Sequence, residues 1–309
     1  MRLKLFPESC QGLLARVSQI VHLGVETIFT VTTNQDISKA LKSFRGMPYF
    51  YATLRYLVFW IFFFSALVSS SIDFIMSDMT QKPVFFFDID NCLYPKSTRV
   101  ANLMTDLIDK YFETHLSLSQ KDANELHFKY HREYGLAIEG LVRHHKVDAL
   151  EYNRKVDDAL PLEDVIKPNP SLHKLLEDID RSKVRLWLFT NAYITHGKRV
   201  IRLLEVEDLF EGITYCDYGA EDIVCKPHTN MFMKAMQEAG VQSPQGCYFV
   251  DDSYNNAKAA QALGWTAVHL LDHSDPDPAH QASQYQIRDL EELRDIFPQF
   301  FKSPVGELK

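Results

Sequence analysis

The sequence predicts an α/β fold, a doubly wound parallel Rossmann-like sheet with an inserted helical cap subdomain. Three observations predict it. From residue 83 onward, short apolar runs alternate with amphipathic stretches, and glycines stand where two of the helices should end. A long interval without a clear strand separates the first two apolar runs. Alternating strands and helices are typical of a parallel sheet that is covered by helices on both faces.

Five apolar runs are predicted to be strands. The first, residues 84–87, reads VFFF and is apolar throughout, as expected for a strand buried on both faces. The others are residues 184–189, 213–216, 247–250 and 266–271. Helical patterns lie between the later runs, at residues 195–205, 230–239 and 254–263. Gly240 and Gly264 follow the second and third of these patterns, where a helix C-cap is expected.

The interval between the first two strands predicts the cap. A bare crossover between parallel strands needs only about a dozen residues, whereas this interval has about 95. Residues 100–160 read as several helices, and Pro161, Pro168 and Pro170 mark the return path. We therefore expect a helical cap over residues 99–180, inserted beside the end of the first strand and so above the site. Residues 81–98 and 181–302 are then the catalytic core.

Residues 1–80 are predicted to be an N-terminal extension. Within it, residues 56–72 read YLVFWIFFFSALVSSSI and carry no charge. This length is close to the lower limit of about 17 residues for a membrane span. Three interpretations stay open: a membrane anchor, a hydrophobic partner for the rest of the chain, or a stretch upstream of the working enzyme, which would start at Met76 or Met79.

Composition and charge narrow the classes of partner. The chain is 46% hydrophobic and 24% charged, which is ordinary for a globular protein, and its net charge of −8 argues against binding a nucleic acid polymer. A small anionic substrate remains compatible with this charge. Its five cysteines form no C-x-x-C pair, which favours free thiols in a reducing compartment. We expect a cytoplasmic or also nuclear protein, or a single-pass membrane protein if residues 56–72 are an anchor.

Polar motifs follow four of the predicted strands. They are Asp88, Asp90 and Asn91 after the first, Thr190 and Asn191 after the second, Lys226 in the loop after the third, and Asp251 and Asp252 with Asn256 after the fourth. Each motif alone is more often a helix cap, a turn or a solvated surface. Together they fall at the carboxyl ends of strands in one sheet, where ligands bind, and this placement favours a single site.

These residue types suit phosphoryl transfer. Asp88 as a nucleophile would form an intermediate that splits the reaction into two easier steps. A Mg²⁺ ion held by carboxylates would screen the repulsion between Asp88 and phosphate, and Lys226 would add positive charge. The Thr190 hydroxyl could hold a phosphate oxygen. Asp90 would protonate the leaving alcohol and then deprotonate the hydrolytic water.

The motifs DxDxxLY, TNA, CKP and VDDSYNN, in this order, resemble motifs one to four of the haloacid dehalogenase superfamily over about residues 83–300. The resemblance implies that Asp88 is the nucleophile and a Mg²⁺ ligand, that Asp252 is a second ligand, and that Asp90 is the acid/base and gives its backbone carbonyl to the metal. It also implies that Thr190 and Asn191 bind phosphate and that Lys226 stabilises the phosphoaspartate. Asp251 and Asn256 would support the metal shell.

A narrower resemblance links FFFDIDNCLYPKST and the stretch from YGLAIEGL to IKPNP to the fungal pyrimidine 5′-nucleotidase group and its plant and bacterial relatives. It implies hydrolysis of UMP or CMP, and some fungal members are similar to lysophosphatidic acid phosphatases. The candidate substrate contacts are Asn91, Tyr94, Tyr134, Gly135, Arg143 and His144. For those in the cap, a packed or solvated helix face is the alternative.

Other functions stay open at this point. A dehalogenase needs no acid/base at the second aspartate, so Asp90 argues against one. A sugar-phosphate phosphatase or a phosphomutase of the same superfamily would retain Asp90. A different class of function is a non-catalytic, membrane-tethered binding protein, but every motif residue is intact.

Overall fold

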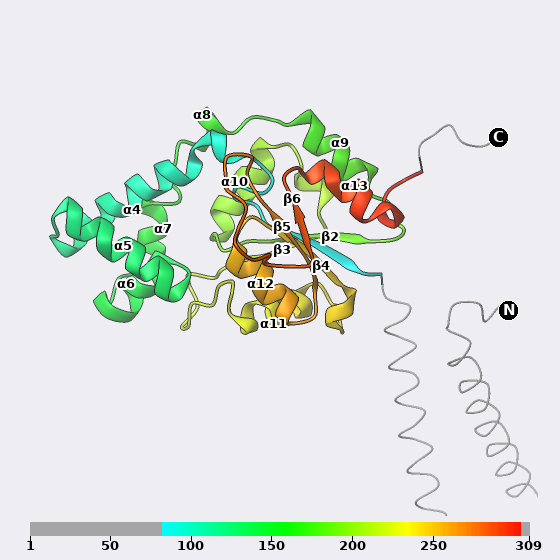
Figure 1. Ribbon diagram of the computed structural model, residues 1–309. Helices are drawn as coiled ribbons and strands as arrows, with labels where there is room; N and C mark the ends of the chain where they lie inside the picture. The colour runs from blue at the N-terminus through cyan, green and yellow to red at the C-terminus, as the bar shows by residue number, and fades with distance from the viewer. Residues whose placement is uncertain (1–81, 304–309) are drawn as a thin grey trace, which may run out of the picture. The chain divides into compact units, whose positions relative to one another are not determined.

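The computed structural model describes residues 82–303, and its sheet confirms the predicted fold class (Figure 1). Six parallel strands lie in the order β3-β2-β1-β4-β5-β6, with helices on both faces. The strands are β1 (Val84–Phe87), β2 (Arg185–Phe189), β3 (Ile213–Thr214), β4 (Cys247–Asp251), β5 (Thr266–Leu270) and β6 (Tyr285–Ile287). The strand β1 therefore lies in the middle of the sheet, between β2 and β4.

The predictions were wrong for the two strands at the edges of the sheet, β6 and β3. The strand β6 was missed because its three residues, YQI, are too few and too polar to form an apolar run. The strand β3 is shorter than the predicted 213–216. It pairs only with the end of β2, in the register Leu188↔Ile213 and Phe189↔Thr214, and has no partner strand beyond Phe189.

The three predicted helices between the later strands are present as α10 (Ile194–Leu203), α11 (Thr229–Glu238) and α12 (Tyr254–Ala262). Gly240 and Gly264 follow α11 and α12 with φ of 68° and 86°. A residue with a Cβ atom is strained at such positive φ, so glycine suits the point where each helix ends. The helix α13 (Leu293–Ile296) lies near the C-terminal end. Single 3₁₀ turns lie at Lys96–Thr98, Glu207–Leu209, Pro244–Gly246, Leu290–Glu292 and Pro298–Phe300.

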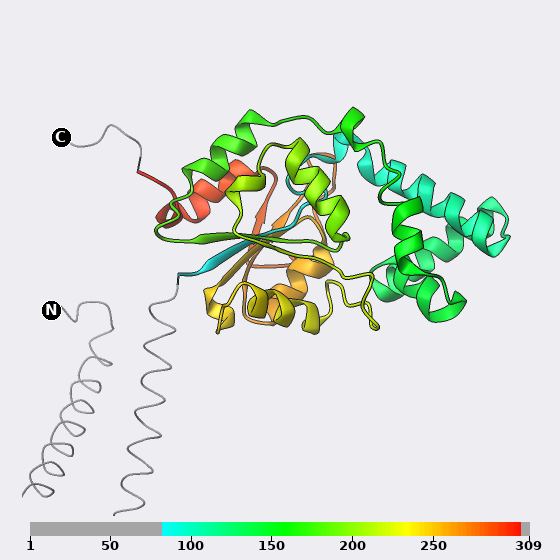
Figure 2. The ribbon, with the colours of Figure 1, turned by 180° about the vertical axis from the view of Figure 1, so that it is seen from behind.

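Six helices lie between β1 and β2: α4 (Val100–Leu116), α5 (Gln120–Tyr134), α6 (Ala137–His145), α7 (Ala149–Lys155), α8 (Leu162–Val165) and α9 (Pro170–Asp178). The first four stand together beside the sheet, as the view from behind shows (Figure 2). Side-chain caps define where two of them begin: Ser119 accepts from the Asp122 amide, and Asp148 from the Leu150 amide. By contrast, Leu172 and Leu176 of α9 belong to the apolar cluster that covers the sheet.

The sheet is buried on both faces because its strands are apolar. Along β1 the side chains alternate, so Phe85 and Phe87 pack in one apolar cluster and Val84 and Phe86 in the other. Helices α9, α10 and α13 contribute to the first cluster, and α11 and α12 to the second. Burying each of these large side chains stabilises the fold by about 1.5–3 kcal/mol. The well-packed strand β1 thus holds the following residue, Asp88, in a defined place.

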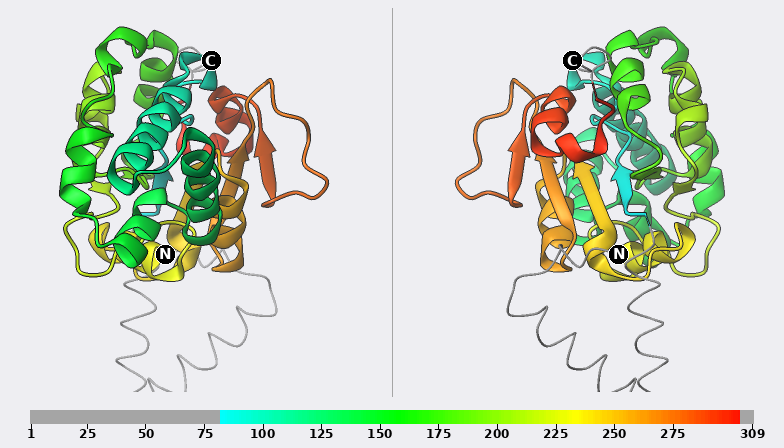
Figure 3. Two further views of the ribbon diagram at one scale, coloured as in Figure 1. Left: turned by 90° about the vertical axis from the view of Figure 1, so that its left-hand side faces the viewer. Right: turned by 90° about the vertical axis from the view of Figure 1, so that its right-hand side faces the viewer.

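One loop departs from this compact arrangement. The segment between β5 and β6, which contains the acidic run DHSDPDP, reaches away from the sheet (Figure 3). Lys96 pairs with Asp275 of this loop at 2.6 Å, and the Arg288 side chain donates to the carbonyls of Asp272 and Asp275. The acidic run is therefore tied to the chain by ordinary ion pairs and hydrogen bonds.

Two further predictions concern location and cysteines. None of the helices within residues 82–303 has the length and apolar character needed to cross a membrane. The predicted extension 1–80, with its apolar segment 56–72, lies outside the described residues. Cys92, Cys216, Cys225 and Cys247 are buried free thiols, as expected.

Candidate active site

The polar motifs meet at the carboxyl ends of the central strands. Asp88 follows β1, Thr190 follows β2, and Asp252 follows β4. From β1 the chain continues to β2 and β3 on one side of β1, and the later strands β4, β5 and β6 lie on the other side. Such a reversal of strand order opens a crevice at the carboxyl ends of the strands in a parallel sheet. A pocket of about 740 Å³ lies there. It is lined by residues that follow these strands, by the loop that carries Lys226, and by residues 131–136 around the end of α5.

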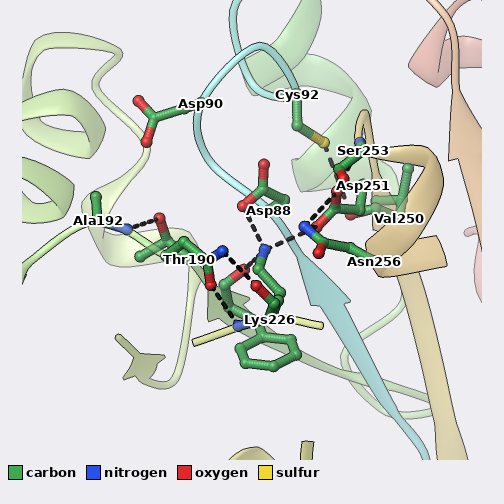
Figure 4. A network of polar contacts seen from close by, with 12 residues as sticks. Asp88, Asp90, Cys92, Thr190, Ala192, Lys226, Val250, Asp251, Ser253 and Asn256 are labelled. Carbon is green, nitrogen blue, oxygen red and sulfur yellow. Dashed lines mark hydrogen bonds and ion pairs between the residues drawn. The ribbon is translucent and has the colours of Figure 1, made fainter. Parts of the chain in front are cut away.

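Lys226 holds the two buried aspartates of the site (Figure 4). Its Nζ donates to Asp88 Oδ1 at 2.6 Å, to Asp251 Oδ2 at 2.7 Å and to the carbonyl of Phe189 at 2.6 Å. These three bonds use all three donors of an ammonium group. The ammonium also lies over the Phe189 and Phe249 rings, 4.9 and 5.3 Å from their centres. Lys226 is only 1% exposed, so it is a fixed internal cation.

Asn191 fixes the loop that carries Lys226. Its Oδ1 accepts from the Lys226 amide at 2.7 Å, and its Nδ2 donates to the Lys226 carbonyl at 2.9 Å. The peptide bond from Lys226 to Pro227 is cis. The Thr190 hydroxyl accepts from the Ala192 amide at 3.0 Å. Thr190 and Asn191, predicted to bind phosphate, both line the pocket, while the Asn191 side chain is already bonded to the backbone of Lys226.

Asp251 is held from several sides. Its Oδ1 accepts from the Ser253 amide at 2.7 Å, and Asn256 Nδ2 lies 3.1 and 3.2 Å from its two oxygens. With the Lys226 bond, every oxygen of this fully buried carboxylate is satisfied. Asp251 is therefore not part of the pocket lining, whereas Asn256, which bonds to it, lines the pocket; their supporting role stays a prediction.

The carboxylates also fit a hard divalent cation. Asp88, Asp251 and Asp252 each offer an oxygen, and these oxygens lie within 4.8 Å of one another. Burial, together with nearby carboxylates, raises the pKa of Asp88 well above its ordinary value and that of Asp252 to about 7. A bound cation would remove this repulsion, and oxygen ligands are what Mg²⁺ prefers. Because Asp251 is already engaged, Asp88 and Asp252 are the ligands that remain available for Mg²⁺.

This site predicts that stability without metal falls as pH rises. An unfolded aspartate titrates near 3.8, whereas Asp252, and likewise Asp157, titrates at about 7 in the folded protein. Between about pH 4 and pH 7 the folded state therefore binds more protons than the unfolded state, and the free energy of unfolding decreases as pH increases. In EDTA we expect Tm to drop between about pH 4 and pH 7, by about 2–4 °C for each kcal/mol by which the free energy of unfolding decreases.

Mg²⁺ should oppose this decrease, since it binds the deprotonated carboxylates. Differential scanning fluorimetry with EDTA or Mg²⁺ checks this, and the rise in Tm on adding Mg²⁺ should be larger at pH 8 than at pH 5.5. An equal rise at the two pH values would show that Mg²⁺ does not bind at these carboxylates.

Asp90 lines the same pocket but is directed away from Asp88 and Lys226 (Figure 4). His196 Nε2 lies 2.7 Å from Asp90 Oδ1, and the Tyr94 hydroxyl donates to the same oxygen at 2.5 Å. Burial alone would raise the pKa of Asp90, but the charge and hydrogen bond of His196 and the bond from Tyr94 outweigh it and lower the pKa. The two motif aspartates thus occupy different electrostatic surroundings, with the pKa of Asp88 raised and that of Asp90 lowered.

The remaining predicted substrate contacts are divided between two places. Asn91, Tyr134 and Gly135 line the pocket, and Asn91 has a left-handed backbone with φ of 59°. Arg143 and His144 do not line it. Arg143 pairs with Glu139 at 2.6 Å and lies over the Tyr134 ring, and His144 Nε2 lies 2.7 Å from the Tyr134 hydroxyl. Both therefore reach the pocket only through Tyr134.

Sequence reasoning missed several residues near the site, among them the following four. His131 and Arg132, from the last turn of α5, line the pocket. The buried His196 bonds to Asp90, and the buried Asp157 lies near enough to interact with the charge of Asp90. His196 had a usable signal, because it lies in the first turn of the helix after Thr190 and Asn191, close to the end of β2. The other three had none, since their place depends on how the helices between β1 and β2 pack.

Comparisons with known proteins point to one family. A family model described as haloacid dehalogenase-like hydrolase matches residues 82–264. A protein of the yeast Saccharomyces cerevisiae, Phosphate metabolism protein 8, is 39% identical over 200 residues, which are 62% of this chain and 62% of the yeast protein. The chain therefore matches less than two thirds of the length of this curated relative.

Solved structures share the fold. A hydrolase from Pseudomonas syringae has a TM-score of 0.52 at 19% identity, over 72% of this chain and 100% of that chain. A mutant of CbbY from Rhodobacter sphaeroides, in complex with xylulose-(1,5)bisphosphate, has a TM-score of 0.50 at 18% identity, over 69% of this chain and 96% of that chain. At these identities the similarity concerns the fold alone.

Proposed function

The chain belongs to the haloacid dehalogenase-like hydrolases, and we propose that it is a Mg²⁺-dependent phosphomonoesterase that acts through an aspartyl-phosphate on Asp88. One observation carries this proposal: the Asp88 carboxylate lies at the pocket, bonded on one oxygen to the buried Lys226 and close to Asp252. A carboxylate held beside a fixed cation and a metal-binding partner is equipped to meet a phosphate group. Solvated aspartates lack both features.

The chain's own residues account for the first step. An oxygen of Asp88 attacks phosphorus and forms the Asp88–phosphate bond, while the bond from phosphorus to the leaving oxygen breaks. The Lys226 ammonium stabilises the negative charge on the transferring group. Mg²⁺, held by Asp88, Asp252 and the Asp90 carbonyl, would supply further charge neutralisation. The loop tied down by Asn191 keeps the ammonium in place during this change.

Asp90 supplies the proton transfers. In its acid form it gives a proton to the leaving oxygen, and as a carboxylate it then takes a proton from the water that hydrolyses the aspartyl-phosphate. Since its pKa is lowered in the free protein, the acid form has to be favoured by the anionic substrate beside it. This role is compatible with its position at the edge of the pocket, away from Lys226 (Figure 4).

For the substrate, we favour a pyrimidine nucleoside monophosphate. A second cavity, of about 390 Å³, adjoins the first at Asp90 and Asn91 and extends under helices α4–α7. Aromatic side chains line it, among them Tyr94, Phe128 and Tyr218. The leaving group of such a substrate is a nucleoside, and its flat base suits an aromatic lining. In this proposal, helices α4–α7 act as a cap that selects the leaving group.

A phosphate-release assay tests the substrate. The full-length protein with Mg²⁺ is offered UMP, CMP, AMP, GMP, sugar phosphates and lysophosphatidate, and UMP and CMP should be hydrolysed with kcat/KM at least about tenfold above the purine nucleotides. Selective release from lysophosphatidate would move the substrate to lipids and favour a membrane role for residues 56–72. Selective release from sugar phosphates would show that the substrate is a sugar phosphate and not a nucleotide. No release from any of them by folded protein would favour a phosphomutase or a binding protein.

A further inference from the structure

Asp90 is anchored on one of its two oxygens. Both hydrogen bonds, from His196 and from Tyr94, end on Oδ1, and none within residues 82–303 ends on Oδ2. The Asp90 side chain is 33% exposed, although both of its partners are buried. The oxygen without a partner is therefore the one that is available to the pocket.

His196 has an arrangement that packing alone does not require. The residue is fully buried, and its Nδ1 is a buried nitrogen without a hydrogen-bond partner in the described part of the chain. Leaving a buried polar atom unpaired is destabilising, and an apolar side chain of similar size would avoid it. The only hydrogen bond that the ring makes within residues 82–303 is the one to Asp90, so its contribution is to that carboxylate.

We infer that His196 is a positioning residue that, together with Tyr94, holds Asp90 so that Oδ2 is the atom that exchanges the proton with the leaving group and with water. This inference rests on the proposed phosphomonoesterase function. Neither the CKP nor the TNA motif assigns a role to His196, which lies on α10 and is not among the residues that line the pocket.

The hydrogen bonds to Oδ1 are compatible with the whole reaction. When Asp90 is the acid, Oδ2 carries the proton, and Oδ1 still accepts from His196 Nε2 and from the Tyr94 hydroxyl. As the phosphorus–oxygen bond breaks, its electron pair stays on the leaving oxygen, which takes the proton from Oδ2. The resulting carboxylate keeps the same two bonds and receives a proton from water on Oδ2 in the second step. The anchor thus holds the reacting oxygen in one direction throughout, which favours the rate.

Phenyl phosphate and 4-nitrophenyl phosphate separate this role from a structural one. Phenoxide is a strong base and depends on protonation when it leaves, whereas the weakly basic 4-nitrophenoxide depends on it far less. The value of kcat/KM reports the step in which these groups leave. In His196→Leu, measured in the full chain with Mg²⁺, we expect kcat/KM to fall at least about tenfold for phenyl phosphate and less than about threefold for 4-nitrophenyl phosphate. His196→Gln, whose amide can donate a similar bond, should recover most of the loss.

Two further variants secure the result. Tyr94→Phe keeps the buried ring and removes the other bond to Oδ1, so it should show the same selective loss even if His196→Leu does not fold. Thr195→Val removes a hydrogen bond to Asp158 from the neighbouring position of α10 and should leave both rates unchanged. Equal losses on the two esters, or no loss in the folded variants, would overturn the inference. A folded wild-type protein that releases phosphate neither from these esters nor from any substrate of the phosphate-release assay would overturn the proposed function itself.

Discussion

Asp88→Asn should abolish turnover, by a factor on the order of 10⁴ or more, while the protein remains folded. An amide cannot form the aspartyl-phosphate. Among the other aspartates of the site within residues 82–303, Asp251 is fully engaged, Asp90 is directed elsewhere, and Asp252 is the proposed Mg²⁺ ligand. The same change should not lower the Tm in EDTA, since burial disfavours the charged form of Asp88 that it removes.

Phosphate release and thermal unfolding on the same samples measure both parts of this prediction. Asp106→Asn on the exposed surface of α4 is a matched control for removing one carboxylate and should change neither quantity. Turnover within tenfold of the wild type in a cleanly folded Asp88→Asn protein would rule out the aspartyl-phosphate mechanism.

Lys226→Met should cost both activity and stability. The substitution keeps the apolar stem between Phe189 and Phe249 but leaves the buried Asp88 and Asp251 without their cation. Breaking a buried ion pair on one side destabilises by about 3–5 kcal/mol. Lys226 lowers the pKa of the buried Asp88, so without Lys226 this pKa should rise further and the folded state should keep its proton to higher pH. The loss of stability should therefore be larger at pH 8 than at pH 5.

Chemical denaturation at the two pH values measures this loss, and phosphate release with Mg²⁺ measures the effect on catalysis, which we expect to be at least about 10³-fold. Lys234→Met is the matched control, because the Lys234 side chain is partly exposed and its Nζ lies as far as 3.9 Å from the nearest Glu238 oxygen. Its change should stay below about 1 kcal/mol. If Lys226→Met were as stable as Lys234→Met at pH 8, the buried ammonium would not be what holds the aspartates.

A large part of the site was predictable because its residues follow strands directly. Asp88, Thr190 and Asp251 lie within one residue of β1, β2 or the end of β4, and the carboxyl ends of parallel strands meet at one edge of the sheet. Lys226 was harder, since it stands in a long loop, and its spacing in the sequence alone does not bring it to Asp88. Its place in the loop after the third strand and the motif resemblance together supplied the expectation for Lys226, and the structure supplied the 2.6 Å contact.

The helices between β1 and β2 mark where sequence reasoning ended. Their periodicity showed that this stretch forms several helices, but neither how many they are nor which of their faces meets the pocket. His131 and Arg132 line it, whereas Arg143 and His144 contact Tyr134 instead. These residues are all polar and lie on neighbouring helices, so only helix packing distinguishes them.

The sequence by itself determined the α/β class, the parallel sheet, the helical insertion and the motif residues at the strand ends. Apolar runs, their alternation with helices and the residues that end each strand are local properties, and local order is enough to set them. Only the tertiary structure decided which carboxylate is held by Lys226, that Asn191 holds the Lys226 loop, and that His196 contacts Asp90. Those contacts join residues far apart in the chain, and they depend on how helices and loops pack against the sheet rather than on spacing in the sequence.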